Sequence, residues 1–172
     1  EDIEIIIIDD DSFDDTKNKI MHLNNSKIKY FKNSKNMGVS KSRIEGVKQS
    51  SGEYIAFLDD DDTWLDEKLS KQFELIQKRN LDFVMSDFII NNKVNQITYE
   101  RSLKKVGSDF KKFIVKSPGP FFQCCLFRAA FLHQHINKID SKAEPSEDWD
   151  FFISISKENP RVENISENLF QW

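Results

Sequence analysis

The sequence predicts an α/β fold in which helices flank a mainly parallel sheet. Segments with strand-like and helix-like patterns alternate along the chain, which is the order that such folds produce. The first segment, residues 3–8, is almost purely β-branched, as expected of a parallel strand that is buried on both faces. Acidic residues directly follow this segment and the strand-like residues 53–58, at the strand ends where ligands bind in such sheets.

Before residue 60, three predicted strands alternate with two predicted helices. Side-chain oxygens of Asp14, Asp15 and Thr16 can cap the first helix, which extends to about residue 23. Apolar residues at helical spacing predict the second helix over residues 39–49, and a glycine follows near its end. The predicted strands cover residues 3–8, 27–31 and 53–58.

A clearer amphipathic pattern follows the second acidic cluster. Apolar side chains recur on one stripe and predict a helix over residues 65–79. They belong to Leu65, Leu69, Phe73 and Ile76. The remaining predicted elements are a strand at 82–90, a hairpin near 91–98, a helix near 109–116, a break at 118–120, a strand at 122–127, and helices at 129–135 and from 147 onward.

The composition is that of an ordinary globular chain. Hydrophobic residues make up 38% and charged residues 31% of the 172 residues, which suits one domain with its own core. Lysine and arginine are scattered and the net charge is −4, so we expect no nucleic-acid partner. No apolar run approaches the roughly 20 residues needed to cross a bilayer. Cys124 and Cys125 are adjacent and suit buried thiols in a reducing compartment; a reactive vicinal pair is the alternative.

The strongest chemical signal is a run of four carboxylates, Asp59 to Asp62, directly after an apolar segment. Adjacent like charges repel and raise one another's pKa values, so folding alone rarely selects such a cluster. A divalent cation removes this penalty. Carboxylate oxygens are the ligands that Mg²⁺ or Mn²⁺ prefers, particularly when a phosphate completes the coordination shell. The run therefore predicts a metal site, and a solvated acidic turn is the alternative.

Four segments together resemble the nucleotide-sugar half of a family 2 glycosyltransferase with the GT-A fold. They are residues 5–12 (IIIIDDDS), 36–43 (NMGVSKSR), 52–62 (GEYIAFLDDDD) and 146–150 (SEDWD). Their order and spacing carry the resemblance, which spans nearly the whole chain. It implies a single domain with a Rossmann-like sheet, whose nucleotide-binding part covers about residues 1–90 and whose acceptor-side part covers about residues 91–172.

The resemblance also implies which residues meet the donor substrate. Asp10 is the candidate contact to the nucleotide base, because a carboxylate can accept a hydrogen bond from the imide N–H of uracil or thymine. Arg43 is the candidate contact to base or phosphate, and Asp59 and Asp60 lie on the ribose or sugar side of the motif. The alternatives are a helix-capping turn for Asp10 and an ordinary surface arginine for Arg43.

The implied metal and catalytic residues are also carboxylates. In the resembled DxD motif the last aspartate binds Mn²⁺ or Mg²⁺, which makes Asp61 the first candidate and Asp62 the second. Glu147 and Asp148 resemble the acceptor-side motif, with Asp148 as the general base. The alternative for Asp148 is a helix cap with an acidic first turn.

The reaction implied is an inverting transfer of a sugar from a nucleoside-diphosphate sugar, expected to be UDP-linked, to a hydroxyl group. The acceptor would be a saccharide or a lipid-linked saccharide in the synthesis of a cell-surface polysaccharide or glycoconjugate. We expect a cytoplasmic location, with peripheral attachment to the inner face of the membrane as a further expectation. The sequence is also compatible with a homodimer.

The chain departs from the family pattern at several places. Asp11 stands where the family usually has glycine, and Ile44 stands where asparagine is common. Family members normally begin with a strand before the segment that here starts at Glu1. We therefore expect the first strand of the sheet to be missing and the chain to be a fragment, which raises the alternative of a degenerate GT-A domain that binds nucleotide without catalysis.

Two other classes of protein match parts of the sequence. A haloacid-dehalogenase-like phosphatase would use Asp59 as nucleophile and Asp61 as acid and base, followed by Thr63, but its motif usually lies on the first strand of the domain. A phospho-receiver or metal-dependent binding module would use Asp9 and Asp10 with Asp59. It needs a lysine at a later strand end, where this chain has Arg128.

Overall fold

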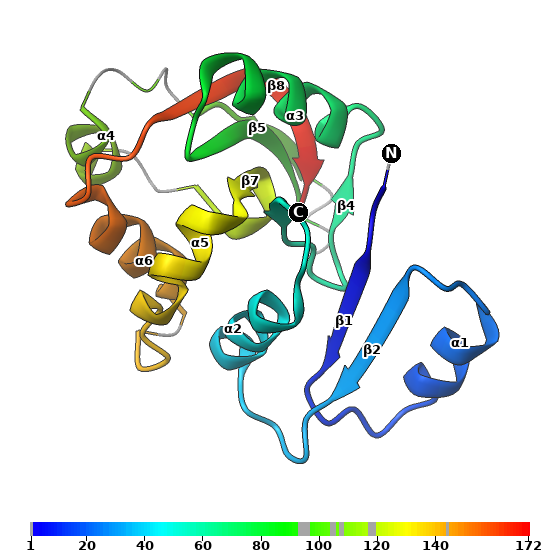
Figure 1. The fold of residues 1–172 in the computed structure, drawn as a ribbon. Helices are drawn as coiled ribbons and strands as arrows, with labels where there is room; N and C mark the ends of the chain where they lie inside the picture. The colour runs from blue at the N-terminus through cyan, green and yellow to red at the C-terminus, as the bar shows by residue number, and fades with distance from the viewer. Residues whose placement is uncertain (1, 93–96, 104–105, 107–108, 117–119, 144) are drawn as a thin grey trace.

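A computed structural model describes residues 2–92, 97–103, 106, 109–116, 120–143 and 145–172, and its strands form two sheets (Figure 1). The small sheet pairs β1 (Ile5–Asp9) with β2 (Ile28–Lys32). The large sheet has the order β3 (Tyr54–Ala56), β7 (Cys125–Arg128), β5 (Phe83–Asn92), β8 (Val162–Gln171) and β4 (Thr63–Trp64), with β6 (Ile97–Arg101) paired to β5. The predicted α/β class is confirmed.

The predicted helices are all present among these residues. They are α1 (Thr16–His22), α2 (Val39–Gln49), α3 (Lys68–Arg79), α4 (Phe110–Lys116), α5 (Ala129–His135) and α6 (Glu147–Ser156). Short 3₁₀ turns cover Phe122–Cys124 and Ile136–Lys138. Two strands, β4 and β8, had no predicted counterpart. The residues between Val162 and Gln171 mix polar and apolar side chains without a clear period of two, which hid a strand.

Strand pairing across the two sheets is mixed rather than mainly parallel. β1 with β2 and β5 with β8 are the parallel pairs, whereas β3–β7, β5–β7, β4–β8 and β5–β6 are antiparallel. Antiparallel neighbours need only a short connection, as in the confirmed hairpin that opposes Asn91 and Thr98. The turn of that hairpin (93–96) and most of the predicted break (118–119) lie outside the described residues.

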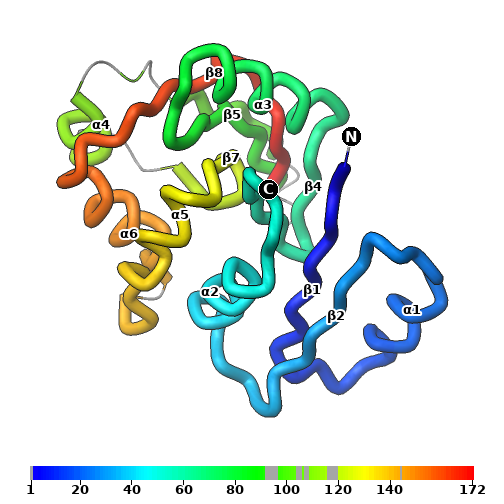
Figure 2. Tube along the Cα trace, in the orientation of Figure 1, coloured from blue at the N-terminus to red at the C-terminus, as the bar shows by residue number. Residues whose placement is uncertain are grey.

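The prediction that the first strand is buried on both faces is wrong. Ile5 keeps 43% of its surface exposed, because among the described strands β1 pairs with β2 alone and α2 covers one face of the pair. The contact with α2 is close: a Cβ placed on Gly46 would lie 3.4 Å from Ile8 Cγ1. Figure 2 shows β1, α1 and β2 as an arm of the molecule beside the larger sheet.

The buried face of α3 is shifted by one residue from the predicted stripe. Lys68, Gln72 and Ile76 are fully buried, whereas Phe73 is partly exposed and packs edge-on against Tyr54. Polar contacts cause the shift. The Lys68 ammonium donates to Gln72 Oε1 at 2.7 Å, and Gln72 Nε2 donates to the backbone carbonyl of Cys124 at 2.7 Å. A stripe of apolar residues in the sequence does not predict that a lysine and a glutamine form a hydrogen bond with each other in the protein interior.

The larger sheet carries a hydrophobic cluster on each face. Alternation along β5 sends Phe83 and Met85 to one face and Val84 to the other. The first face meets α5 and α6 in a core rich in phenylalanine, and the second meets α3. Cys124 and Cys125 are unbridged and fully buried, as predicted, although Cys124 belongs to the 3₁₀ turn and only Cys125 to β7.

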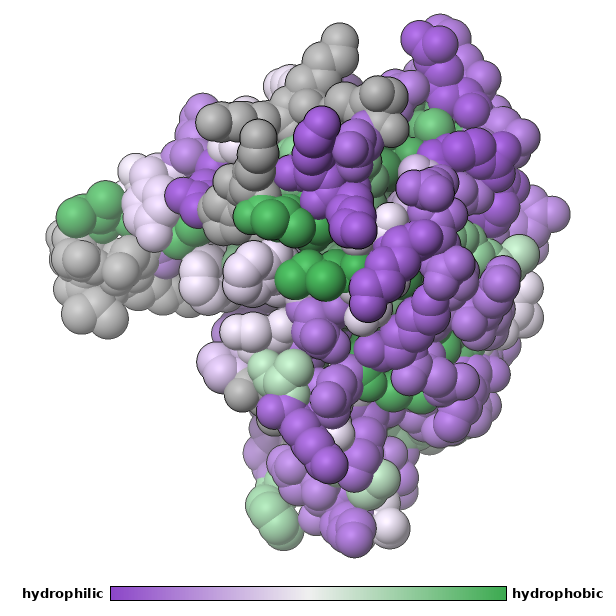
Figure 3. All heavy atoms as spheres, turned by 90° about the vertical axis from the view of Figure 1, so that its left-hand side faces the viewer, coloured by the Kyte–Doolittle hydropathy of each residue, from purple (hydrophilic) through white to green (hydrophobic). Residues whose placement is uncertain are grey.

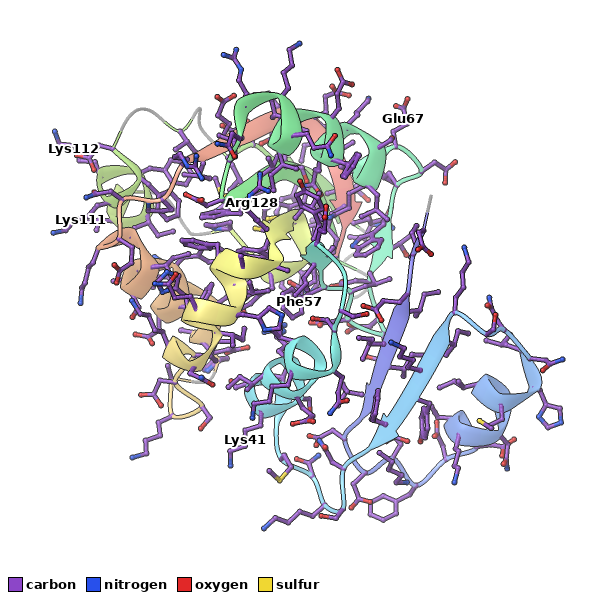
Figure 4. The ribbon with its side chains drawn as sticks, viewed as in Figure 1. Lys41, Phe57, Glu67, Lys111, Lys112 and Arg128 are labelled. Atoms are coloured by element: carbon purple, nitrogen blue, oxygen red, sulfur yellow. The ribbon has the colours of Figure 1, made fainter. Side chains whose placement is uncertain are left out.

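The outer surface is largely hydrophilic on the face seen in Figure 3, where hydrophobic atoms show only as small patches. Lys111 and Lys112 on α4 extend outward, whereas Phe57 lies at the centre of the view in Figure 4. Phe57 packs edge-on against Phe122, with ring centroids 5.0 Å apart. None of the helices in the described part of the chain is long and apolar enough to cross a membrane.

Replacing Phe83 with alanine should lower the free energy of unfolding by roughly 3–5 kcal/mol, the usual cost of truncating a buried phenylalanine. Phe83 is fully buried and its ring contacts those of Phe110, Phe127, Phe131 and Phe152. Urea titration of both proteins measures the loss. Phe13→Ala is the matched control, because Phe13 is 98% exposed and should change stability by less than about 0.5 kcal/mol. Equal losses in the two variants would contradict this core.

Candidate functional site

The acidic run forms a tight turn after β3. The turn is closed by a hydrogen bond from Asp62 N to Asp59 O at 3.2 Å. Asp60 and Asp61 lie exposed at its tip, whereas Asp59 and Asp62 are partly buried at its base. The four carboxylates therefore divide into an inner pair that faces the protein and an outer pair that faces solvent.

Arg43 lies at the centre of the candidate site and is only 8% exposed. Its Nη2 donates to Asp59 Oδ2 at 2.9 Å, and its Nη1 donates to Asp148 Oδ1 at 2.7 Å and to Glu147 Oε1 at 3.2 Å. The guanidinium carbon also lies 5.1 Å from the centre of the Phe122 ring. One buried cation thus joins the strand-end turn to the first turn of α6, and the reading of Arg43 as an ordinary surface arginine is wrong.

Both oxygens of Asp148 are engaged. Oδ1 accepts from Arg43, and Oδ2 accepts from the backbone N–H of Phe122 at 2.9 Å. Burial raises the pKa of Asp148 to about 6, and the nearby Arg43 charge offsets part of that increase. The N-cap of α6 is Ser146, and no capping hydrogen bond from a side chain is present there among the described residues. Asp148 is therefore not the capping residue of α6.

Gln123 completes this group of polar side chains. Its Nε2 donates to Asp59 Oδ2, the oxygen that Arg43 also contacts. Its Oε1 is buried and has no hydrogen-bond partner in the described part of the protein. Nothing in the sequence marked this residue, because a glutamine before two cysteines belongs to no motif.

The pKa of the Asp62 carboxyl group, at the base of the acidic turn, is raised. Burial raises its pKa to about 7, with further contributions from the charges of Asp59 and Asp61. Its Oδ1 is buried and accepts no hydrogen bond from any described residue. A carboxylate in this state is stabilised by an added cation or proton.

These side chains border a cavity of about 150 Å³. One part of its wall is polar and is formed by Arg43, Asp62, Gln123, Glu147 and Asp148. The other part is apolar and is formed by Phe121, Pro145, Phe170 and Trp172. The last strand, β8, brings Phe170 to this wall, and its absence from the predicted elements explains why sequence reasoning missed this part of the site.

Asp10 is placed elsewhere, at the end of β1. Its Oδ1 accepts from Asn33 Nδ2 at 2.7 Å and from Met37 N at 2.8 Å, and its Oδ2 accepts from Gly38 N at 2.7 Å. Asp10 therefore holds the loop that enters α2, and it is not among the residues that line the cavity. The Ser42 side chain hydrogen-bonds Asp10 as well, so donors already occupy about four lone-pair sites of this carboxylate.

The departure at Asp11 has a simple geometric account. Its backbone φ is 70°, in the left-handed region that glycine adopts without steric cost. Aspartate is among the few other residues that tolerate this conformation. The turn expected from a glycine is thus retained here with a side chain.

The structure brings together four of the seven predicted site residues, namely Arg43, Asp59, Asp62 and Asp148. Asp60 and Asp61 belong to the same turn but are exposed, and Asp10 follows β1 of the smaller sheet. Within the described residues, no group of three or more histidine, cysteine, aspartate or glutamate side chains is arranged to hold a metal ion by itself. A metal at this turn would therefore need oxygens from a ligand to complete its shell.

Comparison with known proteins identifies the family. The family described as Glycosyl transferase family 2 matches residues 1–136, and the chain belongs to it. A relative from Escherichia coli, UDP-Glc:alpha-D-GlcNAc-diphosphoundecaprenol beta-1,3-glucosyltransferase WfgD, is 36% identical over 113 residues, which are 60% of this chain and 45% of the relative. The GalNAc(5)-diNAcBac-PP-undecaprenol beta-1,3-glucosyltransferase of Campylobacter jejuni is 37% identical over 131 residues, which are 70% of this chain and 41% of that protein.

A likeness to solved structures confirms the fold. The crystal structure of S. aureus TarS 1-349 in complex with UDP-GlcNAc superposes with a TM-score of 0.77 at 22% identity, covering 98% of this chain and 49% of that one. The predicted GT-A fold is confirmed by this match. The chain spans less than half the length of the two curated relatives named above. The family match removes the haloacid-dehalogenase-like and phospho-receiver alternatives.

Without added metal, Asp62→Asn should stabilise the protein at pH 8 and lose this advantage as the pH falls towards 4. The pKa of Asp62 is raised from 3.8 to about 7 in the folded chain. Between these values the folded chain binds more protons at this site than the unfolded chain does, so its stability falls as the pH rises through that window. Thermal unfolding of both proteins at several pH values measures the difference.

The matched control for this experiment is Asp66→Asn. Asp66 is exposed and lies just beyond the acidic turn, so its replacement should shift stability equally at all of these pH values. Parallel pH profiles for the wild type and Asp62→Asn would show that Asp62 titrates like an ordinary surface carboxylate.

Proposed function

We propose that this chain is the catalytic core of a glycosyltransferase that moves a sugar from a UDP-sugar to a hydroxyl group of a saccharide acceptor. The observation that carries the proposal is the cavity at which Asp148 from α6 and the acidic turn after β3 meet around Arg43. The site supplies a basic carboxylate on one side and, on the other, an acidic turn that can bind a divalent cation. Those are the two groups that such a transfer requires.

In the proposed step, the acceptor hydroxyl attacks the anomeric carbon of the donor and inverts it. A carbon–oxygen bond forms to the acceptor, and the bond to the diphosphate breaks with its electron pair leaving on UDP. Asp148 takes the hydroxyl proton. Its raised pKa of about 6 makes it a stronger base than an ordinary aspartate while it is still ionised at neutral pH.

The surroundings of Asp148 suit this role. Each of its oxygens has one donor among the described groups, which leaves a lone pair on each for the incoming proton. Protonation of Asp148 does not strand the guanidinium, because Arg43 stays paired with Asp59 and Glu147. Arg43 is therefore proposed to position the three carboxylates, in addition to any contact with the donor.

The acidic turn fits a divalent cation. Mg²⁺ is commonly held by one or two carboxylates together with substrate phosphates, and the buried Asp62 Oδ1 without a partner is a ready ligand. We propose Asp61 and Asp62 as the metal side of the site, and Asp59 and Asp60 as its sugar and ribose side. When bound, Mn²⁺ or Mg²⁺ would neutralise the charge that develops on the departing diphosphate.

The acceptor is proposed from the relatives. Two of them are named for transfer to a saccharide linked to diphosphoundecaprenol or PP-undecaprenol. A lipid-linked saccharide at a membrane surface is therefore the acceptor class proposed here, in the synthesis of a bacterial polysaccharide or glycoconjugate. The inner face of the membrane is the proposed site of action. The alternative is a GT-A domain that binds nucleotide without transfer.

UDP should raise the unfolding temperature only when Mn²⁺ or Mg²⁺ is present, because a ligand that binds the folded state alone stabilises it. Asp62→Ala should abolish this metal-dependent shift. Asp66→Ala is the control that keeps it, since that carboxylate is exposed and outside the turn. Loss in Asp61→Ala with full retention in Asp62→Ala would transfer the ligand role to Asp61. No stabilisation by any nucleotide under any metal condition would contradict the proposed function.

Asp148→Asn should reduce turnover by roughly 10²–10⁴-fold, the usual contribution of a general base. Donor binding should change little, because the proton acceptor faces the attacking hydroxyl. Initial rates with a radiolabelled UDP-sugar, together with UDP titrations, separate the two effects.

Asp150→Asn is the matched control for Asp148→Asn. Asp150 lies in the same acidic first turn of α6 but does not line the cavity, so this variant should keep near-normal rates. Near-normal turnover in a folded Asp148→Asn protein would leave Asp148 a structural partner of Arg43 and would favour another base.

A further inference from the structure

The cavity is bordered by three hydrogen-bond acceptors that lack a donor in the described part of the chain. They are Gln123 Oε1, Glu147 Oε2 and Asp62 Oδ1. A buried acceptor without a partner costs free energy, and such groups usually indicate a ligand or water that is needed to satisfy them. Asp62 Oδ1 is already proposed as a ligand of the cation, so Gln123 Oε1 and Glu147 Oε2 are the acceptors that need another donor. Arg43 Nε, on the same wall, is a buried donor without a partner among the described residues, so the missing group both donates and accepts, as a hydroxyl does.

The orientation of the Gln123 amide follows from its neighbour. A carboxylate oxygen can only accept, so the end of the amide that touches Asp59 Oδ2 must be the NH₂ group. The carbonyl end is then the end without a partner. Gln123 is 6% exposed and sits in the middle of a 3₁₀ turn, which is tied to α6 by the bond from Phe122 N to Asp148. Its amide is therefore held in one direction.

The apolar wall of the cavity suits a sugar ring. Phe121 packs against Phe88 and Trp172, with ring centroids 5.3 Å and 5.7 Å apart. Aromatic faces pack against the apolar C–H face of a pyranose, while its hydroxyl groups supply the donors that the polar wall lacks. An anionic group is a poor occupant, because Asp62, Glu147 and Asp148 all border the same space.

We propose that Gln123 is a specificity-determining residue that reads one pyranose hydroxyl through Oε1 while it holds Asp59 through Nε2. This inference rests on the proposed function and deepens it. The hydroxyl belongs either to the donor sugar or to the saccharide acceptor, and Glu147 Oε2 is the second acceptor available to it. A site with such an amide strongly rejects a substrate analogue that lacks the hydroxyl, because binding the analogue leaves a buried polar group without a partner.

The test compares the full-length wild type with Gln123→Met, which keeps the length of the side chain but removes both hydrogen-bonding groups. The substrates are the UDP-sugar that the wild type uses best and its series of monodeoxy analogues. In the wild type, removal of one particular hydroxyl should lower kcat/KM by about tenfold or more, as for a lost hydrogen bond to a buried polar group. In Gln123→Met, the ratio of kcat/KM for the parent UDP-sugar to kcat/KM for that analogue should fall to near one. The corresponding ratios for the other analogues should stay as in the wild type.

A second arm repeats the comparison with monodeoxy acceptors. Collapse of a ratio in the donor series assigns the hydroxyl to the donor sugar, and collapse in the acceptor series assigns it to the acceptor. Gln49→Met is the matched control, because Gln49 lies at the end of α2 and contacts Glu45 away from the cavity. It should leave every ratio unchanged. Gln123→Leu replaces the methionine variant if that protein does not fold.

Unchanged ratios in both series, in a folded and active Gln123 variant, would overturn the inference and leave Gln123 as a positioning residue for Asp59. A different outcome would be a wild-type protein that binds no UDP-sugar and transfers no sugar from one. That outcome overturns the proposed function, and with it the inference built on it.

Discussion

The candidate site depends on one buried cation, the guanidinium of Arg43. It joins Asp59 in the turn after β3 to Glu147 and Asp148 at the start of α6, through contacts of 2.7–3.2 Å. Three carboxylates brought this close would repel one another strongly without it. Arginine suits the position because its planar fork offers several donors in fixed directions and remains charged when buried. The geometry of the cavity follows from this pairing.

The site nevertheless keeps a surplus of negative charge. One guanidinium faces three carboxylates directly, and Asp62 lies close enough to feel the charges of Asp59 and Asp61. Burial, with a smaller contribution from neighbouring carboxylates, raises the pKa values of Asp62 and Asp148, and several buried acceptor oxygens have no partner among the described residues. A cavity of this kind favours cations and hydroxyl donors. A nucleotide sugar with its metal supplies both, which connects the electrostatics of the site to the proposed chemistry.

Much of the local structure was predictable from residue patterns. The bounds of α2 and α5 match the predicted helices, because periodicity and caps are set within a few residues. Pattern reasoning failed where partners are distant. The buried face of α3 is chosen by Gln72 and its contact to Cys124, which is 52 residues away. The mixed pairing of the large sheet also depends on β8, whose residues show no simple alternation.

The order and spacing of four short segments, at residues 5–12, 36–43, 52–62 and 146–150, were enough to recognise the family, because each motif lies within a few consecutive residues. Which oxygens are paired was decided only by the tertiary structure. Arg43 reaches Asp148 across 105 residues, and Gln123 reaches Asp59 across 64. Contacts between residues this far apart leave no pattern in the local sequence, since the partner of a given carboxylate could be any arginine or glutamine that the fold brings near it. Burial, and with it the pKa of each carboxylate, is likewise a property of the packed chain alone.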